Sequence, residues 1–164
     1  MPRECLVEGE AESAEVLGPM RVVVDANVIL PGLGFVDENR VSCEIIMDLI
    51  EAGKISMCVS WPIVKEVGRV ALRKMDGNFN VKKWERLYGL FERAVEFSGE
   101  MVRDLDGLLV DSTDRKYLDV LVKSGANWLV SSDYDLLELN KIYPVVTPDE
   151  FVMRPEVLGL FRPE

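Results

Sequence analysis

Two aspartates follow short apolar runs that have the composition of buried strands. Asp25 comes directly after three valines, residues 22–24. Asp133 follows the apolar pair at residues 129–130 after two serines. Such runs are typical of parallel strands covered on both faces, and ligands gather beyond the carboxyl ends of these strands. We therefore expect both aspartates at the functional edge of a sheet, although a helix cap or turn former is the alternative for either residue alone.

A third acid, Asp114, stands in the first turn of a predicted helix that Thr113 caps and Gly125 ends. This helix precedes a predicted strand at residues 128–130 and runs antiparallel to it. Its N-terminus is therefore expected near Asp133. The alternative explanation is that an acid in a first turn favours the positive end of the helix dipole.

A fourth acid, Glu66, lies about one turn into a helix that follows the predicted strand at residues 55–59. Ser60 caps this helix, and Pro62 occupies its first turn. Because the helix follows its strand, it begins at the same edge of the sheet. The alternative for Glu66 is a solvated residue paired with Lys65 or Arg69.

Four carboxylates at one edge would repel each other unless a cation neutralised them. The chain has no histidine, which excludes imidazole bases and Ser/His/Asp catalysis. Its three cysteines, Cys5, Cys43 and Cys58, show no C-x-x-C spacing, so neither a disulfide framework nor a thiolate zinc site is indicated. Oxygen ligands alone favour Mg²⁺ or Mn²⁺, ions that polarise phosphates and activate water.

Composition indicates one soluble domain. The 164 residues suffice for one sizeable core and are too few for two ordinary domains. A net charge of −10 argues against a protein that coats nucleic acid or anionic membrane through its overall field. No apolar stretch approaches the ~18 residues of a spanning helix, and no signal peptide pattern is present. We expect a cytoplasmic protein.

Strand and helix patterns alternate from residue 21 onward. Helix signals include caps at Ser42 and Ser60, an aromatic stripe at residues 84–95 and a capping box at Thr147. The expected strands lie at residues 22–24, 55–59, 95–97, 128–130 and 143–146. This order predicts an α/β fold, a three-layer α/β/α sandwich around a mainly parallel, twisted sheet of about five strands.

Residues 1–19 are expected to form a weakly ordered acidic extension, and residues 20–164 a single domain. The extension carries five glutamates and one arginine and shows no clear periodicity. Met20 stands directly ahead of the first strand, so either Met1 or Met20 fits as the start of the chain.

These motifs together resemble those of the PIN-domain ribonucleases, a family that includes the VapC-type toxins of toxin–antitoxin pairs. The resemblance spans about residues 20–152. It rests on the order and spacing of the segments at residues 22–28, 60–67, 114–119, 125–126 and 129–137.

The resemblance implies roles for individual residues. The implied metal-binding and catalytic residues are Asp25, Glu66, Asp114 and Asp133. Asn27 is expected to form a hydrogen bond across the site, and Ser131 to orient Asp133. Asp135 adds a ligand or caps the short helix that follows it.

Basic residues are expected to hold the substrate. Residues 65–103 contain nine basic and six acidic side chains, a local excess against the acidic total. The expected positive margin of the cleft comprises Arg69, Arg73, Lys74, Lys82, Lys83 and Arg86, with an ordinary solvated helix surface as the alternative. Many family members have asparagine where Arg115 stands, and this arginine is a further candidate for a phosphate contact.

The expected function is therefore a Mg²⁺- or Mn²⁺-dependent endoribonuclease, plausibly a toxin with an antitoxin partner, and a homodimer. The alternatives are a housekeeping RNA-processing nuclease and a catalytically idle PIN-like module that binds RNA or protein. A phosphoaspartate receiver domain ranks last, because Asp25 has no paired acid and a serine pair replaces the expected lysine near Asp133.

Overall fold

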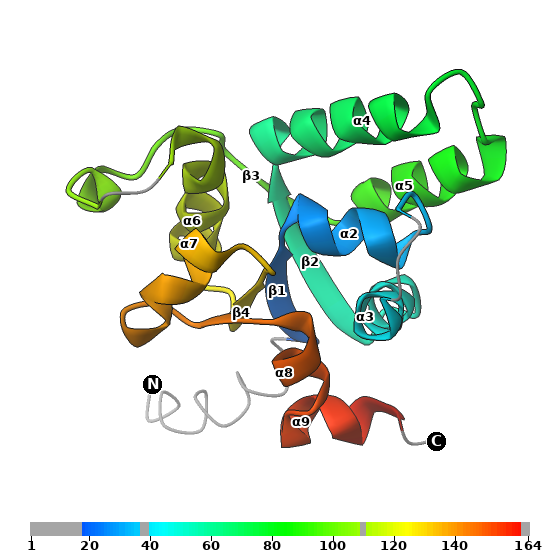
Figure 1. Ribbon diagram of the computed structural model, residues 1–164. Coiled ribbons are helices and arrows are strands. Elements are labelled where there is room, and N and C mark those ends of the chain that lie inside the picture. Colours follow the sequence, from blue (N-terminus) through cyan, green and yellow to red (C-terminus); the bar gives the residue numbers. More distant parts are fainter. Residues whose placement is uncertain (1–17, 37–39, 109–110, 162–164) are drawn as a thin grey trace, which may run out of the picture.

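The computed structural model describes residues 18–36, 40–108 and 111–161 (Figure 1). The extension expected over residues 1–19 lies outside the described residues, except for Gly18 and Pro19. Within the described part of the chain, no helix is both long enough and apolar enough to cross a membrane.

A five-stranded sheet forms the centre of the molecule, and all of its neighbouring strands pair in parallel. The strands are β1 (Met20–Val24), β2 (Ile55–Ser60), β3 (Val95–Phe97), β4 (Trp128–Val130) and β5 (Val145–Val146). Their order across the sheet is β3-β2-β1-β4-β5. The predicted fold class is confirmed, and the last strand is two residues shorter at its start than expected.

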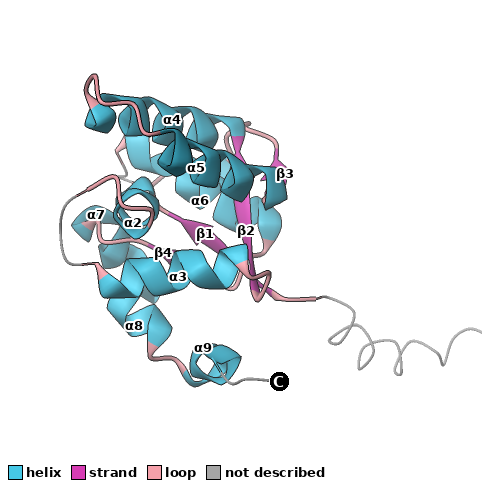
Figure 2. Cartoon of the chain, turned by 90° about the vertical axis from the view of Figure 1, so that its right-hand side faces the viewer, coloured by secondary structure: helices cyan, strands magenta, loops and turns pink. Residues whose placement is uncertain are grey.

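Helices cover both faces of this sheet (Figures 1 and 2). They are α2 (Ala26–Gly32), α3 (Val41–Glu51), α4 (Trp61–Met75), α5 (Val81–Arg93), α6 (Ser112–Ser124), α7 (Tyr134–Leu137), α8 (Pro148–Val152) and α9 (Pro155–Leu158). Helix α6 packs on β1 to β4, while α3, α4 and α5 contact β2 from the other face. Right-handed crossovers produce this division, because the chain moves from β1 towards β3 and then returns across the sheet to β4.

The point where the strand order reverses lies between β1 and β4. Val22, Val23 and Val24 are at most 1% exposed, so the apolar run is covered on both faces as predicted. Parallel sheets form a crevice at such a reversal, beyond the carboxyl ends of the two strands. The fold therefore directs the segments after β1 and β4 to one place.

Helix α2, directly after β1, was not predicted. Its sequence contains Asn27, Pro31 and Gly32, which are poor helix formers. Asp25 caps its N-terminus, and burial of Val28 and its apolar neighbours stabilises it against the adjacent helices. Tertiary packing thus outweighs the low helix propensity.

Two of the four predicted helix caps are wrong, and the other two are confirmed in position. Ser60 is the N-cap residue of α4, although its side chain makes no capping hydrogen bond. Ser42 lies inside α3, and its hydroxyl donates to Asp149 at 2.5 Å, which ties α3 to α8. The cap of α6 is Asp111, whose carboxylate accepts from the backbone N–H of Thr113. The capping box at Thr147 forms as expected.

Close packing of α2 on α3 requires glycine at position 32. A Cβ atom there would lie 2.6 Å from the backbone oxygen of Cys43 and 2.5 Å from Cγ of Met47. We expect Gly32→Ala to lower the free energy of unfolding by about 1–3 kcal/mol, because the helices must separate to admit the methyl group. Urea denaturation measures this loss.

Gly89→Ala is the matched control, since a Cβ atom at position 89 meets nothing within 4 Å. This variant should be as stable as the wild type or slightly more stable. Equal stability of the two variants would contradict the packing argument.

Candidate metal site

Asp25 lies at the carboxyl end of β1 and is 6% exposed. Its backbone N–H donates to the oxygen of Val130 at 3.0 Å, which aligns the ends of β1 and β4. Its carboxylate accepts from the hydroxyl of Ser131 at 2.7 Å and from the N–H of Asn27 at 3.4 Å. Burial raises the pKa of Asp25, and the nearby charges of Asp133 and Glu66 act in the same direction against these hydrogen bonds.

Ser131 connects two of the acids, in a way that differs from the prediction. Its hydroxyl donates to the carboxylate of Asp25 and accepts from the backbone N–H of Asp133 at 2.9 Å. The side chain that it orients is therefore Asp25, and it fixes only the backbone of Asp133. Because Ser131 is fully buried, both hydrogen bonds are shielded from water.

Asn27 crosses the crevice. Its side-chain oxygen accepts from the backbone N–H of Ser132 at 3.3 Å. This contact joins the start of α2 to the segment after β4. With Ser131, it fixes the positions of the two segments that carry Asp25 and Asp133.

Three carboxylates gather beside this network. Asp114, Asp133 and Asp135 each offer an oxygen atom, and these atoms all lie within 4.8 Å of one another. Asp114 comes from the first turn of α6, and the other two from the start of α7. Asp133 itself caps α7 by accepting from the N–H of Asp135 at 2.9 Å. Asp135 is therefore not the cap, and its side chain belongs to the acidic cluster.

Crowding in this cluster perturbs Asp114. Desolvation raises the pKa of its carboxyl to about 7, with the charge of Asp133 and a hydrogen bond to Asp133 as further causes. The charge of Asp25 acts in the same direction. Unpaired carboxylates at this spacing favour either a proton or a bound cation.

Glu66 faces the same edge from α4 and is held by partners of its own. The hydroxyl of Tyr117 donates to its carboxylate at 2.7 Å, and Nζ of Lys116 lies 3.3 Å from the same oxygen. The Tyr117 hydroxyl also accepts from the N–H of Ala26 at 3.2 Å. Glu66 lies outside the close cluster of three, and the structure links it to the Asp25 segment through this phenol.

Tyr117 was not among the predicted site residues. The ring is 1% exposed, but its hydroxyl reaches the site. A usable signal was its spacing, because a residue three positions after Asp114 lies on the same helix face.

The donor set fits a hard divalent cation. Within the described residues, the close cluster offers carboxylate oxygens, without nitrogen or sulfur ligands. Such a set favours Mg²⁺ or Mn²⁺. The residues that would hold the ion are Asp114, Asp133 and Asp135, with Asp25 and Glu66 adding negative charge beside them.

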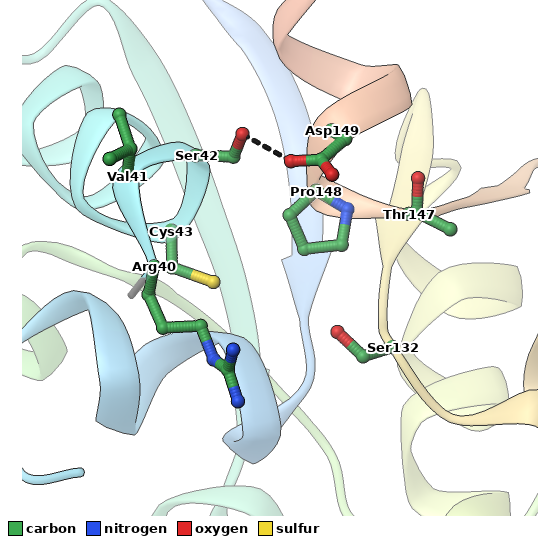
Figure 3. A pocket seen from close by; sticks show the side chains of 8 residues that line it. All are labelled: Arg40, Val41, Ser42, Cys43, Ser132, Thr147, Pro148 and Asp149. Atoms are coloured by element: carbon green, nitrogen blue, oxygen red, sulfur yellow. Dashed lines mark hydrogen bonds between the residues drawn. The ribbon is translucent and has the colours of Figure 1, made fainter. Parts of the chain in front are cut away.

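Two pockets flank these acids. One, of about 510 Å³, has Ser132 and Thr147 on one side and Arg40 on the other (Figure 3). The second, of about 420 Å³, lies between α4 and α6 and is lined by Glu66 and Lys116, among others.

A sequence model of the PIN domain matches residues 21–135, which is more than two thirds of the chain. The chain belongs to the PIN-domain family. A search of curated proteins found no match. The matched region begins just before Asp25 and ends at Asp135, so it includes every acid of the site.

The six residues of the expected basic margin of this PIN domain fall into two groups, two with protein partners and four that are exposed. Arg86 donates to Glu51 at 2.6 and 2.8 Å and to Asp48 at 3.1 Å, and Nζ of Lys83 donates to the oxygen of Gly34. These two side chains hold α5 against neighbouring segments. Arg69, Arg73, Lys74 and Lys82 are exposed.

Arg115 is also engaged within the PIN domain. Its guanidinium lies 2.7 Å from the carboxylate of Asp106 and 3.5 Å from that of Asp119, and it donates to the oxygen of Val102. These contacts fasten the segment before α6. Arg115 therefore has an anchoring role, and its expected phosphate contact stays a prediction, since it also lines the pocket that contains Glu66.

We expect the raised pKa of Asp114 to make the metal-free PIN domain less stable at higher pH. The folded protein binds this proton more tightly than the unfolded chain, whose aspartates have an ordinary pKa of 3.8. The stabilisation from this group is complete below the unfolded pKa and is lost as the pH rises through about 7. In EDTA, the melting temperature of Asp114→Asn should therefore rise relative to that of the wild type between about pH 5 and about pH 8.

Scanning calorimetry across this pH range measures the difference. Asp104→Asn, a change at an exposed position, is the control and should follow the wild type. Parallel profiles for the wild type and Asp114→Asn would contradict the assignment.

We expect Tyr117→Phe to destabilise the PIN domain by about 1–3 kcal/mol, because it leaves the N–H of Ala26 and the carboxylate of Glu66 without this partner. Denaturant unfolding measures the change. Tyr88→Phe removes a hydroxyl from a ring that is 61% exposed and should have no such effect. A Tyr117→Phe protein as stable as this control would refute the bridging role.

Proposed function

We propose that this PIN domain is a metal-dependent endoribonuclease. The observation that carries the proposal is the cluster of Asp114, Asp133 and Asp135, whose oxygens lie within 4.8 Å of one another. Carboxylates held so close favour a divalent cation, and PIN domains form a nuclease-type fold. A bound Mg²⁺ or Mn²⁺ supplies a Lewis acid for a phosphate and lowers the pKa of water.

The chain positions the reacting groups. Ser131 holds the carboxylate of Asp25, and Tyr117 with Lys116 holds that of Glu66, so both acids stay directed to the crevice. Such supports reduce the reorganisation required during the reaction.

The proposed reaction is hydrolysis of an RNA phosphodiester bond. Water forms the new bond to phosphorus and loses a proton, and the bond from phosphorus to the 3′-oxygen breaks. The products are a 5′-phosphate and a 3′-hydroxyl, which takes up a proton.

A toxin role, an antitoxin partner and a homodimer stay predictions that rest on the resemblance. A housekeeping RNA-processing nuclease would use the same acids. An idle PIN-like module would bind RNA or protein through this edge without cutting it.

We expect Asp114→Asn and Asp133→Asn each to lower the rate of RNA cleavage by more than about 100-fold, because each removes a charged oxygen donor from the cluster. The assay follows cleavage of cellular RNA in Mg²⁺ or Mn²⁺, with an EDTA-treated sample as the metal-free reference. Asp104→Asn, purified in parallel, should cut like the wild type. Equal cleavage by all variants would indicate a contaminating nuclease, and RNA binding without any cleavage would favour the idle module.

A further inference from the structure

Helices α4 and α5 lie next to each other (Figure 2). Side chains of both helices line an aromatic groove outside the acidic cluster. Its volume is about 270 Å³. The residues that line this aromatic groove are Trp61, Val64, Lys65, Gly68, Trp84, Leu87, Tyr88 and Phe91. Trp61 and Tyr88 are each 61% exposed, so these two rings of the groove are open to a ligand.

The aromatic groove adjoins, at Lys65, the pocket that contains Glu66. Trp61 begins α4 directly after the last residue of β2, at the sheet edge that carries Asp25. Lys65 lines both the aromatic groove and the 420 Å³ pocket that contains Glu66. One lysine therefore marks the boundary between the two spaces.

The two helices that form the aromatic groove carry positive charge in an acidic protein. Helices α4 and α5 contain eight basic and three acidic residues, a balance of +5, against −10 for the whole chain. Lys65 is exposed at the groove, and Arg69 is exposed in the adjoining pocket. Exposed rings with cations beside them match an aromatic anion, since bases stack on rings and phosphates pair with ammonium and guanidinium groups.

We propose that the aromatic groove binds an unstacked nucleobase of single-stranded RNA, while Lys65 and Arg69 bind the phosphates that lead from it to the metal site. This inference rests on the proposed function and adds a base-binding subsite to it. Duplex RNA is excluded, because its bases are stacked and paired and cannot enter a hollow between two helices.

Gly68 allows the aromatic groove to be filled without disturbing the core. A Cβ atom at this position would meet only Cη2 of Trp84, at the ordinary contact distance of 4.0 Å. Replacing a helical glycine also raises helix propensity. Gly68→Leu should therefore fold and occupy the space of the base. Gly89→Leu on α5 is the matched control, because position 89 opens to free space and does not line the groove.

The first experiment measures RNA binding without cleavage. In the Asp114→Asn background, titration of a short single-stranded RNA should quench the fluorescence of Trp61 and Trp84, and a matched duplex should not. We expect Gly68→Leu to weaken binding of the single strand by about 10- to 100-fold, the range for loss of one stacked base, with Gly89→Leu unchanged. Trp61→Ala should weaken it similarly, with Phe161→Ala, an exposed ring remote from the groove, as its control.

The second experiment measures cleavage. Gly68→Leu in the otherwise wild-type protein should raise KM for single-stranded RNA by a similar factor, while hydrolysis of a small phosphodiester without a base stays unchanged. If no variant cleaves RNA but binding still depends on Gly68, the proposed function fails and the base site stands.

Other outcomes overturn the base site. If Gly68→Leu binds and cleaves single strands like Gly89→Leu, or if duplex binds as tightly, the groove does not hold a base. If Gly68→Leu instead converts a dimer to a monomer in light scattering and leaves RNA affinity unchanged, the groove is a protein interface.

Discussion

Repulsion among carboxylates at the reversal point of the sheet is the constraint on which the site depends. Asp25 is buried at the end of β1, and Asp133 follows β4 and caps the N-terminus of α7. Removing these charges from water is unfavourable. The buried hydroxyl of Ser131 and the backbone N–H groups of Asn27 and Asp135 donate to the two carboxylates and compensate for part of the cost. A bound cation would compensate for the part of this free-energy cost that the hydrogen bonds do not offset. The raised pKa values of Asp25 and Asp114 show that the hydrogen bonds do not fully offset the cost of desolvation.

The strands and the positions of the main acids were predictable from the sequence because they depend on local patterns. Three consecutive valines require cover on both faces, and the acid after them must then lie at the sheet edge. Helix α2 was not predictable in this way, since three of its seven residues are poor helix formers and burial of its apolar side chains contributes to its stability. The same holds for the true cap of α6, where Asp111 and Thr113 are equally good local candidates.

Side-chain partners were the least predictable feature of the site. Ser131 lies two residues from Asp133 in sequence, yet its hydroxyl donates to Asp25 from a different strand. Likewise, Arg86 and Arg115 read as free cations in sequence, and the fold pairs them with acids on other segments. Such choices depend on which groups the sheet order brings together. The partners of these side chains cannot be predicted from periodicity or composition.

The net negative charge of the chain and the positive charge of α4 and α5 act together on an approaching polyanion. Without a cation, the cluster around Asp114 repels a phosphate, and Coulomb repulsion over a few ångströms in a partly desolvated site exceeds the attraction of exposed lysines. With a divalent cation bound, the sign of the local field reverses, and Lys65 and Arg69 then extend a path of positive potential away from it. In the proposed function, occupancy of the metal site therefore controls how closely the RNA backbone can approach. The negative surface elsewhere leaves this path as the favourable approach.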